Sequence, residues 1–564
     1  MPKYNILTTP ESENIPAVPH DYYPRPQFKR DSYISLNGLW DFAVTNDNKV
    51  SFDRKILVPF CPQSSLSGIG ETFKKGAVLH YRRRFSLPDG FNRGRVILNV
   101  GATDQIAEVF LNGKEIGSHI GGYLPFSFDI TEFLADDNEL YIKVYDDPHD
   151  TTLPYGKQKE KRGGMWYTPV SGIWQSVWLE SVPNEYITGI KIDTDMQKAT
   201  IKIDGAECGT ITLHTIDGDE VSEFSNGIAV IAPKEPICWS PENPHLYNFT
   251  LSAGEDKIES YFALRELSVK TVDGTPRLCL NEKPYFFHGL LDQGYFSDGI
   301  YTPATEEGFA RDILSMKELG FNTLRKHIKI EPERFYYDCD RLGMIVFQDM
   351  VNNGKYSFFR DTALPTIGLK CLPAGLFHLK RKTRAAFIKG MEDTVAALYN
   401  HPSICLWTIF NEGWGQFSGN RMYRHLRTLD KSRFIDTASG WFFCRESDIV
   451  SPHIYFKKIK IKPKQKPTLI SEFGGYSYQV EGHIFNDKRE YGYSSYKTQE
   501  EFESAFVALY ENEVIPAVKQ GLCGAVYTQV SDVEDETNGL WTYDRRVLKV
   551  SPEKLLPIAE NLKF

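Results

Sequence analysis

The sequence lacks the features that mark several large classes of protein. No apolar run among its 564 residues approaches the ~18–20 residues of a membrane-spanning helix, so no membrane partner is expected. The first residues, Met-Pro-Lys-Tyr-Asn, contain no charged segment followed by an apolar one, so we expect no signal peptide. Positive charge is not in excess, because 65 basic and 74 acidic residues give a formal net charge of −9. That balance argues against a nucleic-acid partner.

Clustered cysteines are absent as well. None of the 9 cysteines belongs to a C-x-x-C motif or to a close group of cysteine and histidine, which argues against a zinc site. An odd, dispersed set is typical of reduced, mostly buried thiols and predicts a cytoplasmic protein. The cysteines are Cys61, Cys208, Cys238, Cys279, Cys339, Cys371, Cys405, Cys444 and Cys523.

Short strands dominate the first 268 residues. Between residues 1 and 182, alternating runs such as Arg95-Val-Ile-Leu-Asn-Val and Ala107-Glu-Val-Phe-Leu are separated by Gly, Asn and Asp turns. Asn112-Gly113 lies between two such runs and predicts a hairpin. We therefore expect a jelly-roll-like β-sandwich over residues 1–182. A second strand-rich block, residues 183–268, has the length of one immunoglobulin-like sandwich.

The pattern changes at residue 269, where short apolar strands begin to alternate with helical stretches such as Glu306–Leu319, Glu333–Leu342 and Gln499–Lys519. Eight strands predict a (β/α)8, or TIM, barrel over residues 269–564. A doubly wound sheet is the rival fold, but no G-x-G-x-x-G follows any strand. The strands are predicted at Tyr285–Leu291, Asn322–Lys326, Met344–Asp349, Ser403–Asn411, Phe434–Ala438, Asp448–His453, Pro467–Glu472 and Gly524–Val530. The segment Val351–Leu379 lacks clear periodicity and should lie at the C-terminal face, because it follows the third strand.

Two glutamates end two of these strands in the same way. Glu412 follows the fourth strand and Glu472 ends the seventh, and each has glycine close behind it. Carboxylates at the C-terminal ends of barrel strands point into the mouth of the barrel. Hydrolysis of a glycosidic bond needs such a pair, separated by ~5–5.5 Å in a retaining enzyme. The competing explanation is that each glutamate caps a helix or pairs with a lysine.

Motifs spread over nearly the whole chain carry a family resemblance. The most specific are Asn411-Glu412 and Ser471-Glu472-Phe-Gly. They resemble glycoside hydrolase family 2, which includes β-galactosidases, β-glucuronidases and β-mannosidases. Further matching motifs are Tyr23-Pro-Arg-Pro, Leu36-Asn-Gly-Leu-Trp-Asp-Phe, Val109-Phe-Leu-Asn-Gly, Gly121-Gly-Tyr-Leu-Pro-Phe-Ser-Phe-Asp, Ser171-Gly-Ile-Trp-Gln-Ser-Val-Trp-Leu-Glu, Phe287-His-Gly and Phe321-Asn-Thr-Leu-Arg.

The resemblance implies roles for the residues at these motifs. Glu412 would be the acid/base and Glu472 the nucleophile of a double displacement, and Asn411 would bind the sugar 2-hydroxyl. The family's nucleophile usually has a hydroxyl or imidazole nearby. Tyr455 fits that role, with His453 as the alternative.

Other candidates compete with ordinary packing or structural roles. They are Trp166, reaching over from the first sandwich; Trp414, stacking on the sugar or leaving group; Tyr527, as the floor of the sugar pocket; Asp349, binding sugar hydroxyls; and the strand-end pairs Asp292-Gln293 and Lys326-His327.

Departures from the family leave the substrate open. Asn538 has no following lysine of the kind that holds a sugar carboxylate, and the four acids between Asp532 and Glu536 should repel an anionic sugar. No acid–histidine pair follows the third strand, so we expect no metal and no cofactor. The basic run Lys457–Lys466 is expected to be a solvated loop, with an acidic or oligomeric substrate as the alternative.

The expected function is therefore that of a retaining exo-β-glycosidase acting on a carbohydrate, with a β-galactoside favoured. A β-glucuronidase or galacturonidase, a β-mannosidase, an arabinosidase and a catalytically silent carbohydrate-binding protein are the alternatives. A homo-oligomer is left open.

Overall fold

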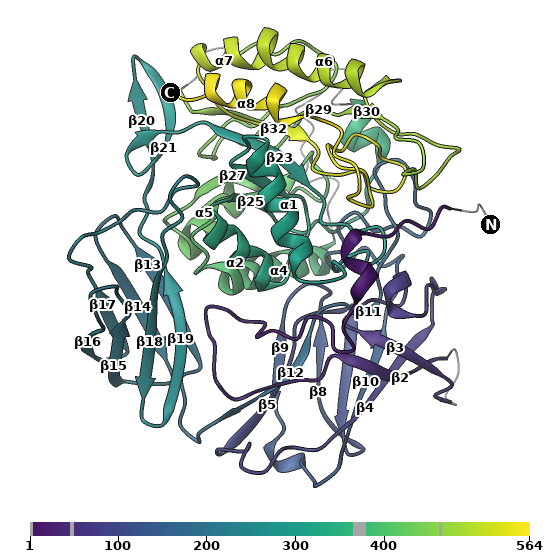
Figure 1. Ribbon diagram of the computed structural model, residues 1–564, viewed down its shortest axis with the longest axis vertical. Coiled ribbons are helices and arrows are strands. Elements are labelled where there is room, and N and C mark those ends of the chain that lie inside the picture. The colour runs from purple at the N-terminus through teal and green to yellow at the C-terminus, as the bar shows by residue number, and fades with distance from the viewer. Residues whose placement is uncertain (1–3, 46–49, 365–379, 462–464) are drawn as a thin grey trace.

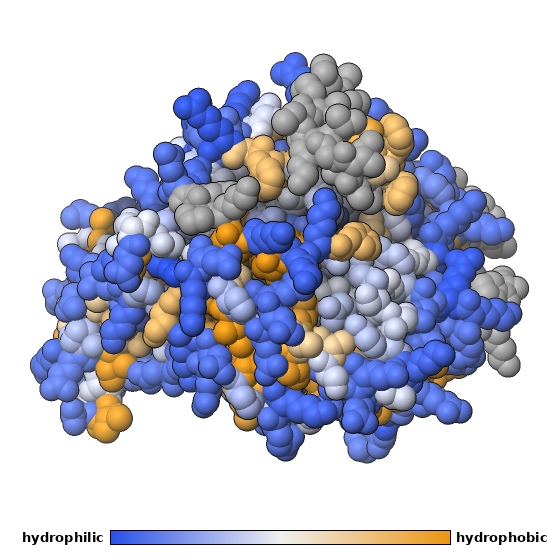
Figure 2. Space-filling model, turned by 90° about the horizontal axis from the view of Figure 1, so that it is seen from above, coloured by the Kyte–Doolittle hydropathy of each residue, from blue (hydrophilic) through white to orange (hydrophobic). Residues whose placement is uncertain are grey.

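The computed structural model describes residues 4–45, 50–364, 380–461 and 465–564. Two β-sandwiches lie side by side beneath a barrel of strands and helices (Figure 1). The predicted fold class is thereby confirmed, while the domain boundaries after residues 182 and 268 stay predictions. None of the helices in the described residues has both the length and the apolar character needed to cross a membrane. Seen from above, the surface is mainly hydrophilic, with hydrophobic residues gathered in a central band (Figure 2).

The first sandwich encloses its own apolar core between two antiparallel sheets. Inward-facing residues alternate with half-buried ones along Asn138–Tyr145, as expected of a strand with one buried face. The predicted hairpin forms at Asn112 and Gly113, whose φ angles of 52° and 77° suit a tight turn. One sheet has the order β1 (Tyr33–Ser35), β12 (Val177–Val182), β5 (Arg95–Val100) and β9 (Phe126–Asp129). The other has the order β3 (Arg54–Val58), β2 (Gly38–Thr45), β4 (Val78–Phe85), β10 (Asn138–Tyr145), β7 (Ile106–Leu111) and β8 (Lys114–Ile120).

The second sandwich is built from seven antiparallel strands around a separate core of mostly Ile, Leu and Phe side chains. Their order is β13 (Gly189–Thr194), β14 (Ala199–Asp204), β17 (Ile228–Ile231), β16 (Glu220–Ser225), β15 (Cys208–Leu213), β18 (Tyr247–Ala253) and β19 (Asp256–Phe262).

The barrel has eight parallel strands with helices outside them. The strands are β23 (Phe287–Asp292), β24 (Thr323–Lys326), β25 (Ile345–Asp349), β26 (Ile404–Asn411), β27 (Phe434–Ser439), β28 (His453–Ile454), β29 (Thr468–Gly474) and β32 (Leu522–Thr528). The helices are α1 (Glu307–Glu318), α2 (Glu333–Leu342), α4 (Arg381–Leu398), α5 (Gly419–Leu429), α6 (Gln499–Leu509), α7 (Ile515–Lys519) and α8 (Pro552–Asn561).

Two predicted elements differ from the structure for reasons that involve proline. The sixth strand is short, because Pro452 cannot donate to the ladder, although Gly440 N still donates to Ser451 O at 2.9 Å as the barrel closes. The helix predicted at Gln499–Lys519 is divided by a π-type turn at Tyr510–Val514, just before Pro516. Much of the predicted irregular segment Val351–Leu379 lies outside the described residues.

The bottom of the barrel is closed by apolar side chains. The hairpin of β20 (Leu267–Val272) and β21 (Thr275–Leu280), with β22 (Lys283–Pro284) beside it, contributes Leu278 and Leu280 to the cluster that fills this end. This apolar plug restricts polar chemistry to the opposite end, where the strands finish.

A loop of the first sandwich completes the wall of that opposite end. Tyr155 N donates to Asn352 O at 3.0 Å, and Thr168 N donates to Glu534 Oε1 at 2.9 Å. Because these contacts join residues about 200 and 366 positions apart, the mouth of the barrel belongs to two domains. The paired strands β30 (Tyr476–Tyr478) and β31 (Ser494–Tyr496) lie in the chain after β29.

Candidate functional site

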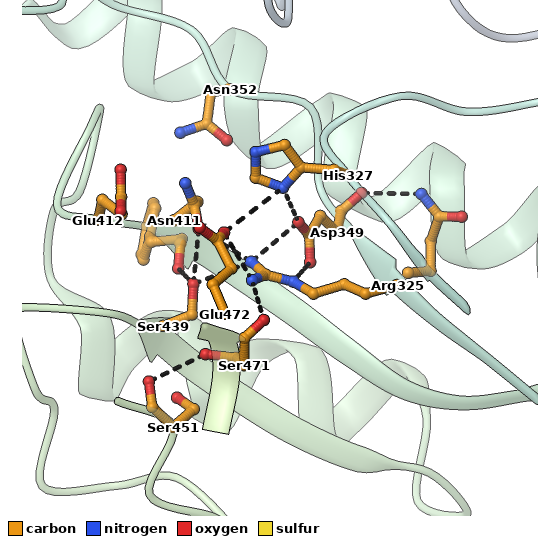
Figure 3. Close-up of polar contacts among 12 residues, drawn as sticks. Arg325, His327, Asp349, Asn352, Asn411, Glu412, Ser439, Ser451, Ser471 and Glu472 are labelled. Carbon is orange, nitrogen blue, oxygen red and sulfur yellow. Dashed lines mark hydrogen bonds and ion pairs between the residues drawn. The ribbon is translucent and has the colours of Figure 1, made fainter. Parts of the chain in front are cut away.

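A buried arginine organises the polar end of the barrel. Arg325, on β24, is 1% exposed and directs its guanidinium across the barrel interior (Figure 3). Its Nε and one terminal nitrogen form a two-point ion pair with Asp349, at 3.0 Å each. The other terminal nitrogen donates to Glu472 Oε1 at 2.9 Å and to Ser471 O at 3.0 Å. A rigid, fully charged fork of this kind can hold several acceptors in fixed positions.

The same guanidinium orients Asn411. Arg325 donates to Asn411 Oδ1 at 2.9 Å, and Ser439 Oγ donates to the same oxygen at 2.8 Å. Because the amide oxygen is saturated in this way, the side-chain NH2 of Asn411 is turned toward the open site as a donor (Figure 3).

Glu412 and Glu472 lie close together at the ends of β26 and β29. His453 Nδ1 lies 2.8 Å from Glu412 Oε1 and 3.4 Å from Glu472 Oε2. One oxygen of each carboxylate and this nitrogen all lie within 4.8 Å of one another. The two glutamates that the sequence singles out therefore share one site.

The tautomer of His453 follows from its second neighbour. Arg325 can only donate, and its nitrogen lies 3.4 Å from His453 Nε2, so this ring nitrogen is the acceptor. The proton of a neutral imidazole then sits on Nδ1, from which it is donated to Glu412.

The backbone of Glu412 is strained. Its φ of 52° lies in the left-handed region, which non-glycine residues seldom adopt. The following residue, Gly413, also has a positive φ, of 77°, and a Cβ there would lie 2.2 Å from the ring of Phe442. Strain of this kind persists where surrounding contacts impose it, and it is concentrated at functional sites.

Glu472 is held in its charged form. Burial raises the pKa of its carboxyl, but the neighbouring His453, Arg325 and His327 and a hydrogen bond from Tyr455 outweigh burial and bring the pKa well below its usual range. Tyr455 Oη donates to Glu472 Oε2 at 2.6 Å, and its ring stacks on Tyr493 at 3.7 Å. The predicted choice between Tyr455 and His453 is thus not exclusive, since both lie beside Glu472.

Asp349 and His327 form the opposite side of the site. His327 Nδ1 lies 2.9 Å from Asp349 Oδ2, and burial lowers the pKa of this histidine. Burial also opposes the charge on Asp349, but Arg325 and His327 keep the pKa of its carboxyl below the usual value.

Four other predicted residues are also buried, and their contacts join them to neighbours other than the two glutamates. Asp292 is engaged by Lys326 Nζ at 2.6 Å, and Gln293 beside it is 4% exposed. Trp166 and Trp414 are 8% and 3% exposed and meet edge to face, with ring centroids 5.2 Å apart. They form a wall between the first sandwich and the barrel.

The interpretation of Tyr527 as a pocket floor is wrong. Its ring is fully buried against Phe506 of α6, with the ring centroids 4.7 Å apart. Its hydroxyl accepts a hydrogen bond from Tyr476 N at 3.2 Å. Successive side chains of a strand point to opposite faces, so the next residue, Thr528, faces the interior instead. Thr528 Oγ1 lies 2.9 Å from the hydroxyl of Tyr455.

The acidic loop after β32 differs electrostatically from the prediction. Its four acids are 4–5% exposed, and each has a hydrogen-bonding partner. Lys549 pairs with Asp532, Thr168 N with Glu534, Asn486 with Asp535, and Tyr167 with Glu536. The loop is therefore not a bare anionic surface, and the predicted repulsion of an anionic sugar is weakened, because cations pair with two of the acids: Lys549 with Asp532 and Arg162 with Glu534.

Sequence reasoning missed several residues of the site, chiefly Arg325, Ser439, Thr528 and Tyr493. Only Arg325 lies in a motif that the sequence analysis quotes, Phe321-Asn-Thr-Leu-Arg. Ser439, Thr528 and Tyr493 lie in no motif of this kind. The residues beside them in the chain do not show which barrel residues they contact.

Comparisons with known proteins agree with this geometry. The family model described as "Glycosyl hydrolases family 2, TIM barrel domain" matches residues 272–547, and "Glycosyl hydrolase 2 galactose-binding domain-like" matches residues 73–172. The chain is 28% identical over 407 residues to a β-galactosidase of Aeromonas hydrophila, covering 66% of this chain and 37% of that protein. It is 23% identical over 448 residues to a β-galactosidase of Thermoanaerobacter pseudethanolicus, covering 72% and 54%. The chain thus spans about a third to a half of the length of these relatives.

Solved structures share the fold along almost the entire chain. A β-D-glucuronidase of Dictyoglomus thermophilum superposes with a TM-score of 0.72 at 18% identity, covering 96% of this chain and 98% of that one. A β-galacturonidase of Eisenbergiella tayi superposes with a TM-score of 0.67 at 19% identity, covering 96% and 99%.

Asp436, on β27, provides a prediction about pH. Burial raises the pKa of its carboxyl to about 7, although Ser451, Arg325 and His453 oppose the rise. The folded protein then binds a proton that the unfolded chain releases between pH ~4 and ~7, so this group makes the protein less stable as pH rises. In Asp436→Asn this loss should be absent, so stability relative to wild type should rise by up to about 4 kcal/mol from pH 4 to pH 8.

Urea-induced unfolding of both proteins at pH 4 and pH 8 measures this difference. Contributions from groups that do not interact with Asp436 cancel when the variant is compared with wild type at each pH. A difference in unfolding free energy that is the same at both pH values would show that Asp436 is ionised throughout.

Proposed function

Because the chain belongs to glycoside hydrolase family 2, we propose that it is a retaining β-glycosidase that removes a terminal sugar from the non-reducing end of its substrate. The observation that carries the proposal is the pair Glu412 and Glu472, with carboxylate oxygens within 4.8 Å of each other. Nearest oxygens this close are compatible with the ~5–5.5 Å between carboxyl groups in a retaining enzyme, whereas an inverting enzyme keeps the groups ~6.5–9.5 Å apart to accommodate a water molecule.

Glu472 is suited to act as the nucleophile. Arg325 and Tyr455 occupy both of its oxygens with strong donors and favour the carboxylate over the acid. In the first step this carboxylate forms a bond to the anomeric carbon while the bond from that carbon to the leaving oxygen breaks.

Glu412 is suited to act as the acid and then the base. Its side chain is 19% exposed, more than the 7% of Glu472, and this exposure provides a path for the leaving group and for water. It donates a proton to the leaving oxygen, and afterwards it accepts a proton from the water that cleaves the sugar from Glu472.

His453 is placed to stabilise negative charge on either of the two carboxylates. When Glu472 is consumed in the covalent intermediate, Glu412 has become charged by giving up its proton. The Nδ1–H of His453 lies within reach of both groups, at 2.8 and 3.4 Å, and stabilises the charge in either position. The free NH2 of Asn411 is placed to donate to the sugar 2-hydroxyl, which strengthens binding in the transition state.

A silent carbohydrate-binding protein accounts poorly for this site. Burying Arg325, Asp349 and Glu472 together carries a desolvation cost, and sugar binding alone requires neither the nucleophile nor its charge. Strongly perturbed charges gathered in one polar pocket favour catalysis.

A β-galactoside is the first substrate to test, since the curated relatives described above carry the name β-galactosidase. A β-uronide is the second, because of one residue. Lys157 is half-buried in the loop from the first sandwich. Burial raises the pKa of Glu536 and the charge of Lys157 opposes that rise, whereas burial lowers the pKa of His327 and the charge of Lys157 lowers it further. The ammonium of Lys157 therefore faces this side of the mouth. No carboxylate of the described residues forms an ion pair with it within 4.0 Å, which leaves its charge available to a sugar carboxylate.

The first prediction of this proposal concerns the nucleophile. Glu472→Gln should lower kcat on a 4-nitrophenyl β-glycoside by at least about a thousandfold, because the amide cannot form the glycosyl-enzyme. Glu503→Gln, which alters a buried glutamate paired with Lys554 on the far side of the barrel wall, should stay within about twofold of wild type. More than a tenth of the wild-type rate in Glu472→Gln would contradict the assignment.

The second prediction concerns stereochemistry. Two successive inversions, first by Glu472 and then by water, should return the sugar with its β configuration. Proton NMR of the product in the first minutes, before mutarotation, measures the anomer directly. An α-anomer appearing first would refute double displacement even if both glutamates proved essential.

The third prediction separates the two substrate classes. The 4-nitrophenyl β-galactoside, β-glucuronide and β-galacturonide are compared in wild type and in Lys157→Met. If the substrate is a uronide, the variant should lose at least about tenfold in kcat/KM on the uronides while the galactoside rate changes little. Lys159→Met is the matched control, because it removes another cation from the same loop. Lys159 Nζ lies over the ring of Trp166, 4.4 Å from its centroid. Equal losses on all three glycosides would remove Lys157 as a basis for uronide binding.

A further inference from the structure

The position of Glu412 locates the group that leaves. An acid catalyst must lie within hydrogen-bonding distance of the leaving oxygen, so the remainder of the substrate has to lie beside Glu412. The contacts around Glu412 therefore describe the site that receives the leaving group.

The loop after β27 approaches Glu412 closely. A Cβ added to Gly440 would lie 3.1 Å from Glu412 Cγ and 3.1 Å from His453 Nδ1. The residue that follows, Trp441, is half-buried, and its ring lies edge to face with His453, with centroids 6.0 Å apart. Trp441 is thus separated from the acid by a single histidine.

Trp441 differs from the other tryptophans at the mouth. Trp166 and Trp414 are closed against each other and against Tyr155 and Tyr356, and their rings are almost fully covered. Trp441 is only half-buried, and among the described residues its indole N–H donates to no protein acceptor. An open indole face beside an acid catalyst can take a flat apolar surface, and its N–H can donate to a hydroxyl at the edge.

A second aromatic group extends this surface. Phe456, which follows Tyr455, is 70% exposed and lies edge to face with Tyr493 at 5.2 Å. Tyr493 in turn stacks on Tyr455, which donates to Glu472. Aromatic side chains therefore continue outward from the two carboxylates along the loops that follow β27 and β28.

We propose that Trp441 is the platform of a leaving-group site and that this site takes a ring with an apolar face. An aryl group and the apolar face of a second sugar share this chemistry. The proposal rests on the proposed function, because it takes Glu412 as the acid. It adds that selectivity for the leaving side of the substrate comes from the loop after β27.

The test measures binding without chemistry. Methyl and phenyl β-thioglycosides, and a thio-linked disaccharide, compete with a 4-nitrophenyl glycoside of the sugar selected by the panel above, with galactose tried first. Wild type should bind the ringed inhibitors about tenfold more tightly than the methyl compound. Trp441→Ala should remove that preference and leave the inhibition constant of the methyl compound within about twofold.

Two further variants sharpen the result. Trp441→Phe retains a ring and should keep most of the preference. Phe564→Ala removes a half-exposed ring beside Arg277 of β21, at the opposite end of the barrel, and should change nothing. Because the methyl compound reports on the sugar pocket, an unchanged constant shows that the pocket and the fold survive. The larger loss, for the phenyl compound or for the disaccharide, shows which kind of ring the site prefers.

The opposing results are equally definite. If Trp441→Ala retains the preference for a ring, or weakens the methyl and ringed compounds alike, the platform does not exist. Failure of the proposed function has a separate sign, namely a wild-type protein that releases nitrophenol from none of the glycosides, and that result would overturn both proposals.

Discussion

The polar end of the barrel depends on the guanidinium of Arg325. A buried cation is costly unless its donors are all engaged, and here every donor direction meets an acceptor from another strand. The arginine lies on β24, and its partners lie on β25, β26, β27 and β29. One side chain thereby sets the relative positions of five strands and supplies the positive charge that lets Asp349 and Glu472 remain ionised away from water.

Strand ends were predictable from the sequence, whereas side-chain directions were less so. Apolar runs followed by Glu412 and Glu472 identify two strand ends, and barrel topology brings strand ends together, so the pair could be found without coordinates. Tyr527 shows the limit. The strand itself was recognised, but a displacement of one residue reverses the face that a side chain occupies, and Thr528 is the residue that faces the site.

Electrostatics was harder to predict than topology. The sequence between Asp532 and Glu536 contains four acids in five positions and resembles an anionic surface. In the structure their partners come from distant positions, such as Thr168 in the first sandwich and Lys549 after the loop. Local composition therefore misstates the field that a substrate meets, because the compensating groups are remote in the chain. Arg325 was missed for the complementary reason: a single basic residue in a strand gives no sign of the six acceptor residues around it.

The loop that the first sandwich contributes to the mouth has a consequence for biosynthesis. Its residues, including Tyr155 and Thr168, leave the ribosome well before the barrel strands that they contact. The sandwich has its own core and can fold while the barrel is still incomplete. The last barrel strand, β32, and the loop that carries Glu534 are made later and close against this segment. Because Tyr167 and Trp166 are buried together with barrel residues, the loop gains its packing only as the barrel forms, and the pocket is finished only after β32 is in place.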